Sequence, residues 1–246
     1  MTAPKPLLSR FDAIALALAV AMACALAWFS LRSSEDRSQG VPAPSSQVLA
    51  LLPAPTSGLQ TVVLAGGCFW GVQAVFQHTQ GVVSAVSGYA GADAASATYA
   101  QVSTGGTRHA EAVQITFDPK LIDLAQLLHI FFAVAHDPTE INRQGPDIGP
   151  HYRSAVFYGD SAQKQATKAY IDQINASKAF TQPIATELAA LTATHSFYPA
   201  EPEHQNYATR HPDSPYIAQF DAPKIAALQR VFAAVFRSTP VLVALP

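Results

Sequence analysis

The sequence predicts an α+β fold with one main domain. Strand-like and helix-like segments are mixed along the chain without a strict strand–helix–strand alternation. Residues 61–65 are β-branched and apolar, as in a buried strand, whereas residues 121–136 repeat leucine and phenylalanine at the spacing of one helix face. A length of 246 residues suits one ordinary domain with an additional segment.

The expected elements follow one another from residue 60 onward. The first strand ends at Gly66 and Gly67, a pair that favours a tight turn, and apolar residues at helical spacing then predict a helix over 68–78. We expect further strands at 82–88, 112–117, 154–158 and 183–191. Further helices are expected at 121–136, at 161–176 after a cap formed by Asp160 and Ser161, and at 223–236.

The first 31 residues predict a signal peptide or an N-terminal membrane anchor. Residues 13–29 are an unbroken apolar run, longer than the core of an ordinary signal peptide and at the short end of a membrane span. Small residues at 25–27 favour cleavage, and Trp28 with Phe29 favours retention at a membrane interface. Because basic residues precede the run, we expect the rest of the chain to be exported, in the periplasm or another extracytoplasmic space.

Composition divides the remaining chain and excludes some functions. Residues 32–59 are rich in Ser, Pro and Gly and predict a flexible linker, followed by a catalytic domain over 60–238 and a tail over 239–246. A net charge of -2 leaves no basic patch for nucleic acid. The two cysteines are Cys24, inside the apolar run, and Cys68, so the chain carries no disulfide framework.

Cys68 lies where a strand is expected to turn into a helix. A helix N-terminus lowers the pKa of a thiol because the thiolate faces unpaired amides and the positive end of the helix dipole. Phe69 and Trp70 follow directly and offer an apolar surface that suits a group resembling a methyl thioether. A nucleophile and a small buried hydrophobic residue are both compatible with this turn taken alone.

Several further motifs occur in one order along residues 62–207. They are Gly66-Gly67-Cys68-Phe69-Trp70-Gly71, Ser87-Gly88-Tyr89-Ala90-Gly91, Thr98-Tyr99, His109-Ala110-Glu111-Ala112-Val113, His136-Asp137-Pro138-Thr139, Asn142-Arg143-Gln144-Gly145, Asp147, Tyr152-Arg153-Ser154 and Phe197-Tyr198-Pro199-Ala200-Glu201. In this order they resemble the methionine sulfoxide reductase A family. Pro215-Tyr216-Ile217 and Pro223-Lys224 resemble the members that lack C-terminal cysteines. The resemblance implies a two-layer sandwich of a mixed sheet and packed helices, with a ferredoxin-like core.

The resemblance also implies an activity. The enzyme would reduce methionine S-sulfoxide in oxidised proteins and peptides to methionine, as a repair reaction. Cys68 would attack the sulfur and become a sulfenic acid. Glu111 would donate the proton, because burial in the apolar string 110–113 raises the pKa of a carboxyl group. Tyr99 and Tyr152 would hydrogen-bond the sulfoxide oxygen.

The family pattern assigns the remaining site residues and the reductant. Phe69 and Trp70 would receive the substrate methyl group. Asp147, in the active loop, would serve orientation and hydrogen bonding in the site. Residues 199–246 contain no cysteine, so an external thiol, either a thioredoxin-like or glutaredoxin-like protein or a small thiol, would regenerate Cys68. We expect no other cofactor and a monomer. His109, His136 and His151 are too far apart in sequence, without further ligands, to predict a metal site.

Departures from the family pattern and two rival functions complete the sequence-based hypotheses. Gln73, Arg108, Pro146, Pro150 and His151 depart from the pattern without removing a reacting group, and Arg108 bears on substrate preference. A Cys–His hydrolase, with His109 or His204 as base, would need no reductant. A membrane-tethered binding module would merely bury Cys68. Neither rival accounts for Glu111 and the two tyrosines occurring in the family's order.

Overall fold

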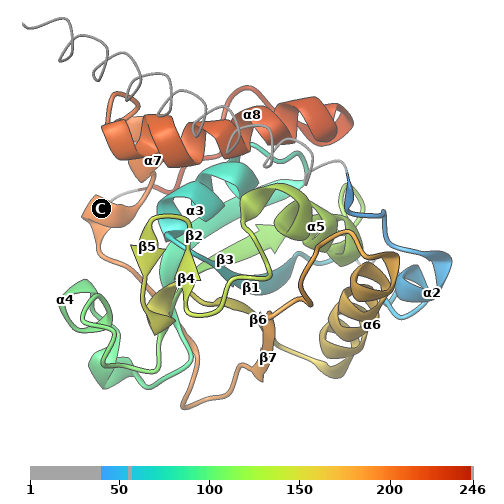
Figure 1. The fold of residues 1–246 in the computed structure, drawn as a ribbon, viewed down its shortest axis with the longest axis horizontal. Coiled ribbons are helices and arrows are strands. Elements are labelled where there is room, and N and C mark those ends of the chain that lie inside the picture. Colours follow the sequence, from blue (N-terminus) through green and yellow to red (C-terminus); the bar gives the residue numbers. More distant parts are fainter. Residues whose placement is uncertain (1–39, 55–56, 245–246) are drawn as a thin grey trace, which may run out of the picture. The chain divides into compact units, whose positions relative to one another are not determined.

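A six-stranded sheet forms the centre of the computed structural model, which describes residues 40–54 and 57–244 (Figure 1). The strand order is β7-β6-β1-β3-β2-β8. The strands are β1 (Gln60–Gly66), β2 (Val82–Ala90), β3 (Ala110–Phe117), β6 (Ser154–Tyr158), β7 (Glu187–Ala190) and β8 (Phe197–Pro199). Neighbouring strands are antiparallel except β6 and β7, which are parallel. The sheet is therefore mixed, as predicted.

Two helices complete a ferredoxin-like core. They are α3 (Phe69–Gln77), between β1 and β2, and α5 (Leu124–Ile130), between β3 and β6, which continues as a π-helical turn over Phe131–Ala135. Strand–helix–strand–strand–helix–strand connectivity with the central order β6-β1-β3-β2 is the ferredoxin-like arrangement. The predicted α+β fold and its core type are confirmed.

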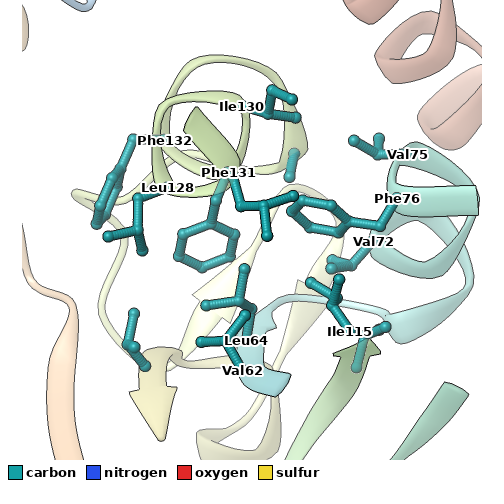
Figure 2. Packing of buried hydrophobic residues seen from close by; sticks show 14 of the residues in the cluster. Val62, Leu64, Val72, Val75, Phe76, Ile115, Leu128, Ile130, Phe131 and Phe132 are labelled. Atoms are coloured by element: carbon teal, nitrogen blue, oxygen red, sulfur yellow. The ribbon is translucent and has the colours of Figure 1, made fainter. Parts of the chain in front are cut away.

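Alternation along β1 explains how the sheet is buried on both faces. Val62 and Leu64 belong to the larger apolar cluster, which contains α3 and α5, while Val63 and Ala65 belong to a second cluster on the other face. Figure 2 shows Phe131 pointing toward Val62 and Leu64 in the larger cluster. Because β1 is fixed from both sides, the turn that follows it at Gly66 is held firmly.

The remaining elements surround this core, and several were not expected from the sequence. The helices are α2 (Ser46–Leu49), α4 (Tyr99–Val102), α6 (Ser161–Ser177), α7 (Tyr207–Arg210) and α8 (Ala222–Val231); the hairpin is β4 (Arg143–Gln144) with β5 (Asp147–Ile148). Short 3-10 turns cover Ala94–Ser96, Pro150–Tyr152, Pro202–His204 and Ala233–Val235, and a second π-helical turn covers Ile217–Asp221. The predicted Asp160 cap of α6 is found, since its side chain accepts a hydrogen bond from Gln163 N. The last helix ends at Val231, before the predicted residue 236.

The linker prediction is wrong for residues 40–54, which pack on the domain. Val41 and Val48 are buried, at 5% and 1% exposure. Tyr170 of α6 donates its hydroxyl hydrogen bond to Pro42 O at 2.7 Å, and Gln173 bonds Ala43 O and Ser45 N at 2.7 and 2.9 Å. A segment with little local structure thus has its backbone groups satisfied by side chains distant in sequence.

The predicted tail also packs, at least over residues 241–243. Val241 N donates to Gln77 O at 3.0 Å, and Val243 exchanges two hydrogen bonds with the Asn206 side chain. The apolar run 13–29 lies outside the described residues. Within residues 40–54 and 57–244, no helix has both the length and the apolar character needed to span a bilayer.

A buried amide network joins the C-terminal segment to α3 and β2. Gln73 donates to Ala85 O at 3.0 Å and to the Gln205 side chain at 2.9 Å, and it accepts from Asn206 N at 2.8 Å. Gln205 in turn bonds both backbone groups of Ser87. Gln73, which departs from the family pattern, therefore supplies two donors and one acceptor that this arrangement requires.

Candidate active site

One end of the sheet brings the nucleophile and the acid together. The register of β1 with β3 pairs Leu64 with Val113, so its continuation sets Glu111 opposite Gly66. Cys68 follows two residues later as the N-cap of α3. Gly67 has a φ of 88°, and a Cβ there would overlap the side chain of Gln144 from the hairpin. The turn thus needs glycine both for its conformation and for the close approach of strand β4.

A small cavity of about 160 Å³ lies at this end of the sheet. Its lining contains every site residue predicted from the sequence, together with Tyr216: Cys68, Phe69, Trp70, Tyr99, Glu111, Asp147, Tyr152 and Tyr216. A larger hollow of about 350 Å³, lined by residues 52–53, 59–61 and the start of α6 among others, contains no cysteine, histidine or tyrosine. Of these two hollows, the smaller therefore holds the thiol together with the buried acid and three tyrosines.

The prediction of a lowered pKa for the Cys68 thiol is wrong for the structure without substrate. Burial raises the pKa of the thiol well above its usual value, and the nearby carboxylates of Glu111 and Asp221 raise it further. The backbone N–H of Trp70 and the charge of Lys224 act in the opposite direction. Cys68 is only 8% exposed, so loss of hydration outweighs the helix N-terminus. The resting residue is a thiol.

Glu111 has the raised pKa expected of it. Its side chain is 2% exposed, and burial is the main reason that the pKa rises to about 8. The hydrogen bond that Oε2 accepts from Phe69 N at 3.0 Å lowers the pKa, while the negative charge of Asp147 raises it. The carboxyl group is therefore mostly protonated at neutral pH and can donate a proton.

The tyrosines come from three separate segments. Tyr99 begins α4, Tyr152 ends the 3-10 turn at Pro150–Tyr152, and Tyr216 precedes the π-helical turn at Ile217–Asp221. Burial raises the pKa of all three phenols, so each remains a neutral hydrogen-bond donor. Tyr216 donates a hydrogen bond to Asp147 Oδ2. Three neutral donors and one carboxylate thus line a cavity beside the thiol.

Aromatic rings form one wall of the cavity and identify a residue that the sequence analysis missed. Trp70 stacks on Tyr207 with ring centroids 3.7 Å apart and meets the edge of Tyr216 at 5.8 Å. Tyr216 was noted only as part of a C-terminal motif, because nothing in its local sequence connects it with Asp147. Its place in the cavity depends on how the C-terminal segment folds back over α3.

The family comparison agrees with this geometry. A family model described as peptide methionine sulfoxide reductase matches residues 60–234. The chain belongs to the peptide methionine sulfoxide reductase family. It reduces methionine sulfoxide in proteins in a thiol-dependent reaction, so the hydrolase and binding-module alternatives are excluded.

The match extends over nearly the whole length of the curated relatives. Peptide methionine sulfoxide reductase MsrA 2 of Mesorhizobium japonicum is 48% identical over 76% of this chain and 94% of its own. MsrA of Ralstonia nicotianae is 48% identical over 71% of this chain and 92% of its own. Among solved structures, reduced Mxr1 of Saccharomyces cerevisiae has a TM-score of 0.60 at 29% identity, covering 68% of this chain and 93% of its own. Methionine sulfoxide reductase A of Corynebacterium diphtheriae has a TM-score of 0.54 at 31% identity, and the match covers 70% of this chain and 82% of its own.

The three histidines considered as metal ligands have separate environments in the reductase. His136 bonds Phe131 O at 3.0 Å and Ser154 Oγ at 2.7 Å, and burial lowers its pKa to about 4. His109 bonds Asp93 O at 2.9 Å, and the His151 ring lies tilted against that of Tyr152, with ring centroids 4.0 Å apart. In the described part of the chain, no cluster of three or more His, Cys, Asp or Glu side chains is arranged to hold a metal ion.

A partly buried ion pair lies against the first turn of α3 in the reductase. Lys224 Nζ lies 3.1 Å from Asp221 Oδ1, and the Asp221 side chain is fully buried. A Cβ on Gly71 would overlap Asp221 Oδ1, so glycine at this position lets the pair approach the helix. The two charges have opposite effects on the pKa of Cys68: Asp221 raises it and Lys224 lowers it.

We predict that Asp221→Asn lowers the pKa of Cys68 and that Lys224→Met, added to it, raises the pKa again. Removing the carboxylate leaves the ammonium uncompensated, which favours the thiolate. The pH dependence of Cys68 alkylation by iodoacetamide measures both changes, and we expect several-fold faster alkylation at neutral pH in the single variant. Loosened packing alone would speed alkylation in both variants, so a double variant that reacts still faster would contradict this electrostatic explanation.

Proposed function

We propose that this cavity reduces the S epimer of methionine sulfoxide, with Cys68 as nucleophile and Glu111 as proton donor. The observation that carries the proposal is the hydrogen bond from Phe69 N to Glu111 Oε2 at 3.0 Å. Phe69 is the residue after Cys68, so the acid is tied to the backbone that holds the thiol. Both groups are buried in one cavity, and each is protonated at neutral pH.

The reaction balances with these two groups. The Cys68 sulfur attacks the substrate sulfur while Glu111 protonates the sulfoxide oxygen, and the thiol proton then passes to the Glu111 carboxylate. As the bond between the two sulfurs breaks, the hydroxyl group moves to Cys68. Methionine and a Cys68 sulfenic acid result, so the substrate sulfur gains two electrons and Cys68 loses two. Glu111 ends the step protonated, as it began.

The other cavity residues would bind the substrate. Tyr99 and Tyr152 are neutral donors that suit a polar S=O oxygen on which negative charge develops. Phe69 and Trp70 supply apolar surface for the methyl group. Asp147, held in place by the Tyr216 hydroxyl, raises the pKa of Glu111 and so helps to keep that acid protonated. Tyr216 thereby joins the proposed site as the residue that holds Asp147.

Regeneration of Cys68 would need an external thiol. Cys68 is the only cysteine among the described residues. A first thiol would attack the sulfenic sulfur and release water, and a second would break the mixed disulfide and restore the Cys68 thiol. A thioredoxin-like or glutaredoxin-like protein or a small thiol can supply both. Mass spectrometry after treatment with sulfoxide and no reductant should show one added oxygen on Cys68; a disulfide between Cys24 and Cys68 would contradict this route.

We further propose that the enzyme is exported, works as a monomer and contacts the membrane through its N-terminal segment. The apolar run 13–29, with basic residues before it, supports export with the domain outside the cytoplasm. Fractionation of cells that produce the full chain tests this. Recovery of the enzyme in the cytoplasmic fraction would contradict export, and a signal that is cleaved would release the domain from the membrane fraction.

The decisive assay is reductant-dependent loss of methionine S-sulfoxide, with the R epimer as control. We expect turnover of the S epimer only. The cavity has a volume of about 160 Å³, and its hydrogen-bond donors and its apolar wall have fixed positions, so it accepts one arrangement of oxygen and methyl around the substrate sulfur. Dithiothreitol serves as the reductant. Equal turnover of the two epimers, or sustained multiple turnover without any thiol, would refute the proposed function.

A further inference from the structure

The position of Tyr99 is not explained by its own segment. Residues 91–98, which lead to it, are glycine, alanine, serine, threonine and one aspartate, and none of them is buried. The helix α4 has only four residues, and its N-cap, Thr98, makes no side-chain capping hydrogen bond. A short helix of this kind is marginal by itself. Something outside the segment must hold the ring of Tyr99 at the cavity.

Glu201 contacts both this segment and the sheet. Its Oε1 accepts a hydrogen bond from Tyr99 N at 2.8 Å, and its Oε2 accepts one from the Tyr89 hydroxyl at 2.8 Å. Tyr89 is fully buried in β2. The carboxylate therefore acts as the missing cap of α4, by bonding an amide that a helix N-terminus leaves unpaired, and it joins that amide to the rigid sheet.

His204, in the same short segment, holds the ring from one side. Its imidazole lies 4.2 Å from the Tyr99 ring centroid and 5.6 Å from that of Phe69. His204 N donates to Glu201 O at 3.0 Å, so the two side chains come from one turn. Burial by itself raises the pKa of Glu201, but the hydrogen bonds from Tyr99 N and the Tyr89 hydroxyl make the overall shift downward. The carboxylate is therefore ionised at neutral pH, as a strong acceptor should be.

We propose that Glu201 is a positioning residue of the reductase, which places the Tyr99 phenol for its hydrogen bond to the sulfoxide oxygen. Glu201 does not line the cavity, and it acts on the reaction only through Tyr99. This inference rests on the role of Tyr99 in the proposed function. A misplacement of about 1 Å can lower a rate by about a hundredfold, so a loosened Tyr99 has a measurable consequence.

The test is a double-mutant cycle of Glu201→Ala and Tyr99→Phe, measured by the rate of sulfenic acid formation in a single turnover without reductant. We expect Glu201→Ala to lower this rate about 10- to 100-fold in the wild-type background. In the Tyr99→Phe background the same change should have almost no further effect, because the hydroxyl that Glu201 positions is already absent. Glu201→Gln should restore most of the rate, since its amide oxygen still accepts from Tyr99 N.

Two controls separate positioning from stability. Glu203→Ala removes a carboxylate from the same 3-10 turn, but this residue is exposed, so the rate should not change. Tyr89→Phe removes only the sheet-side hydrogen bond and should give a smaller loss in the same rate, which keeps the proposal testable if Glu201→Ala does not fold.

Each outcome of the cycle has a distinct meaning. Equal losses from Glu201→Ala in both Tyr99 backgrounds would overturn the positioning role, because the residue would then act by another route. If Tyr99→Phe alone leaves the rate unchanged, the role of Tyr99 in the proposed function fails instead. A full rate in Glu201→Ala, with Tyr99→Phe impaired, would also overturn the inference.

Discussion

Replacing Cys68 with serine is expected to reduce methionine sulfoxide reduction to the rate without enzyme. A serine hydroxyl is nearly isosteric with the thiol, so the N-cap of α3 and its 8% exposure should be kept. The hydroxyl is a far weaker nucleophile toward sulfur and cannot form a sulfenic acid that a thiol would reduce. Reductant-dependent loss of the S epimer measures the effect, and circular dichroism verifies the fold.

Cys24→Ser is the matched control, because it removes the other cysteine of the chain, which takes no part in the proposed route. We expect it to retain full activity with dithiothreitol as the reductant. Activity that survives Cys68→Ser would refute the assignment of the nucleophile. A large loss in Cys24→Ser would instead show that regeneration passes through an intramolecular disulfide.

Replacing Glu111 with glutamine should lower the rate of sulfenic acid formation by about 10²- to 10⁴-fold, the usual contribution of a positioned general acid. Glutamine keeps the size of the side chain, and its amide oxygen can still accept from Phe69 N. It cannot transfer a proton to the sulfoxide oxygen. Single-turnover kinetics without reductant isolate this step, and an unchanged melting temperature shows that packing is preserved.

The pH dependence provides an independent check on Glu111. The acid must be protonated to donate, and burial raises its pKa to about 8. The wild-type rate should therefore be level below that pH and fall about tenfold per pH unit above it. The pKa of Cys68 is raised well above 9.0, so the thiol keeps its proton over the same range. A falling limb that persists near pH 8 in Glu111→Gln would belong to another group.

Local patterns were sufficient where an element is long or where its residues lie close together in sequence. The buried strand β1, the strand–turn–helix around Cys68 and the Asp160 cap were all recognised from residues close together in sequence. The ferredoxin-like core follows from the motif order through the family resemblance. Short elements such as α4 and β8 escaped prediction, because four or three residues carry no detectable period and tertiary contacts stabilise them.

The site residues were predictable where they belong to recognisable motifs. Cys68 lies directly after β1 and Glu111 lies within β3, and the family resemblance of the motifs around them suggested their chemistry. Tyr216 and Glu201 act through partners far away in sequence, Asp147 and Tyr99, and no local pattern records such a pairing. Residues 40–54 were misjudged for the same reason, since side chains of α6 bind their backbone.

The sequence by itself determined the family and the fold class, and it supplied the side chains proposed to carry the reaction, because those inferences depend on residue type and order. Only the tertiary structure decided the electrostatic state of the thiol. A helix N-terminus favours the thiolate, yet burial, reinforced by the Asp221 carboxylate, leaves Cys68 protonated at rest. Burial depends on how distant segments close over a residue, so the pKa of Cys68 follows from the packing around it and not from its own position in the chain.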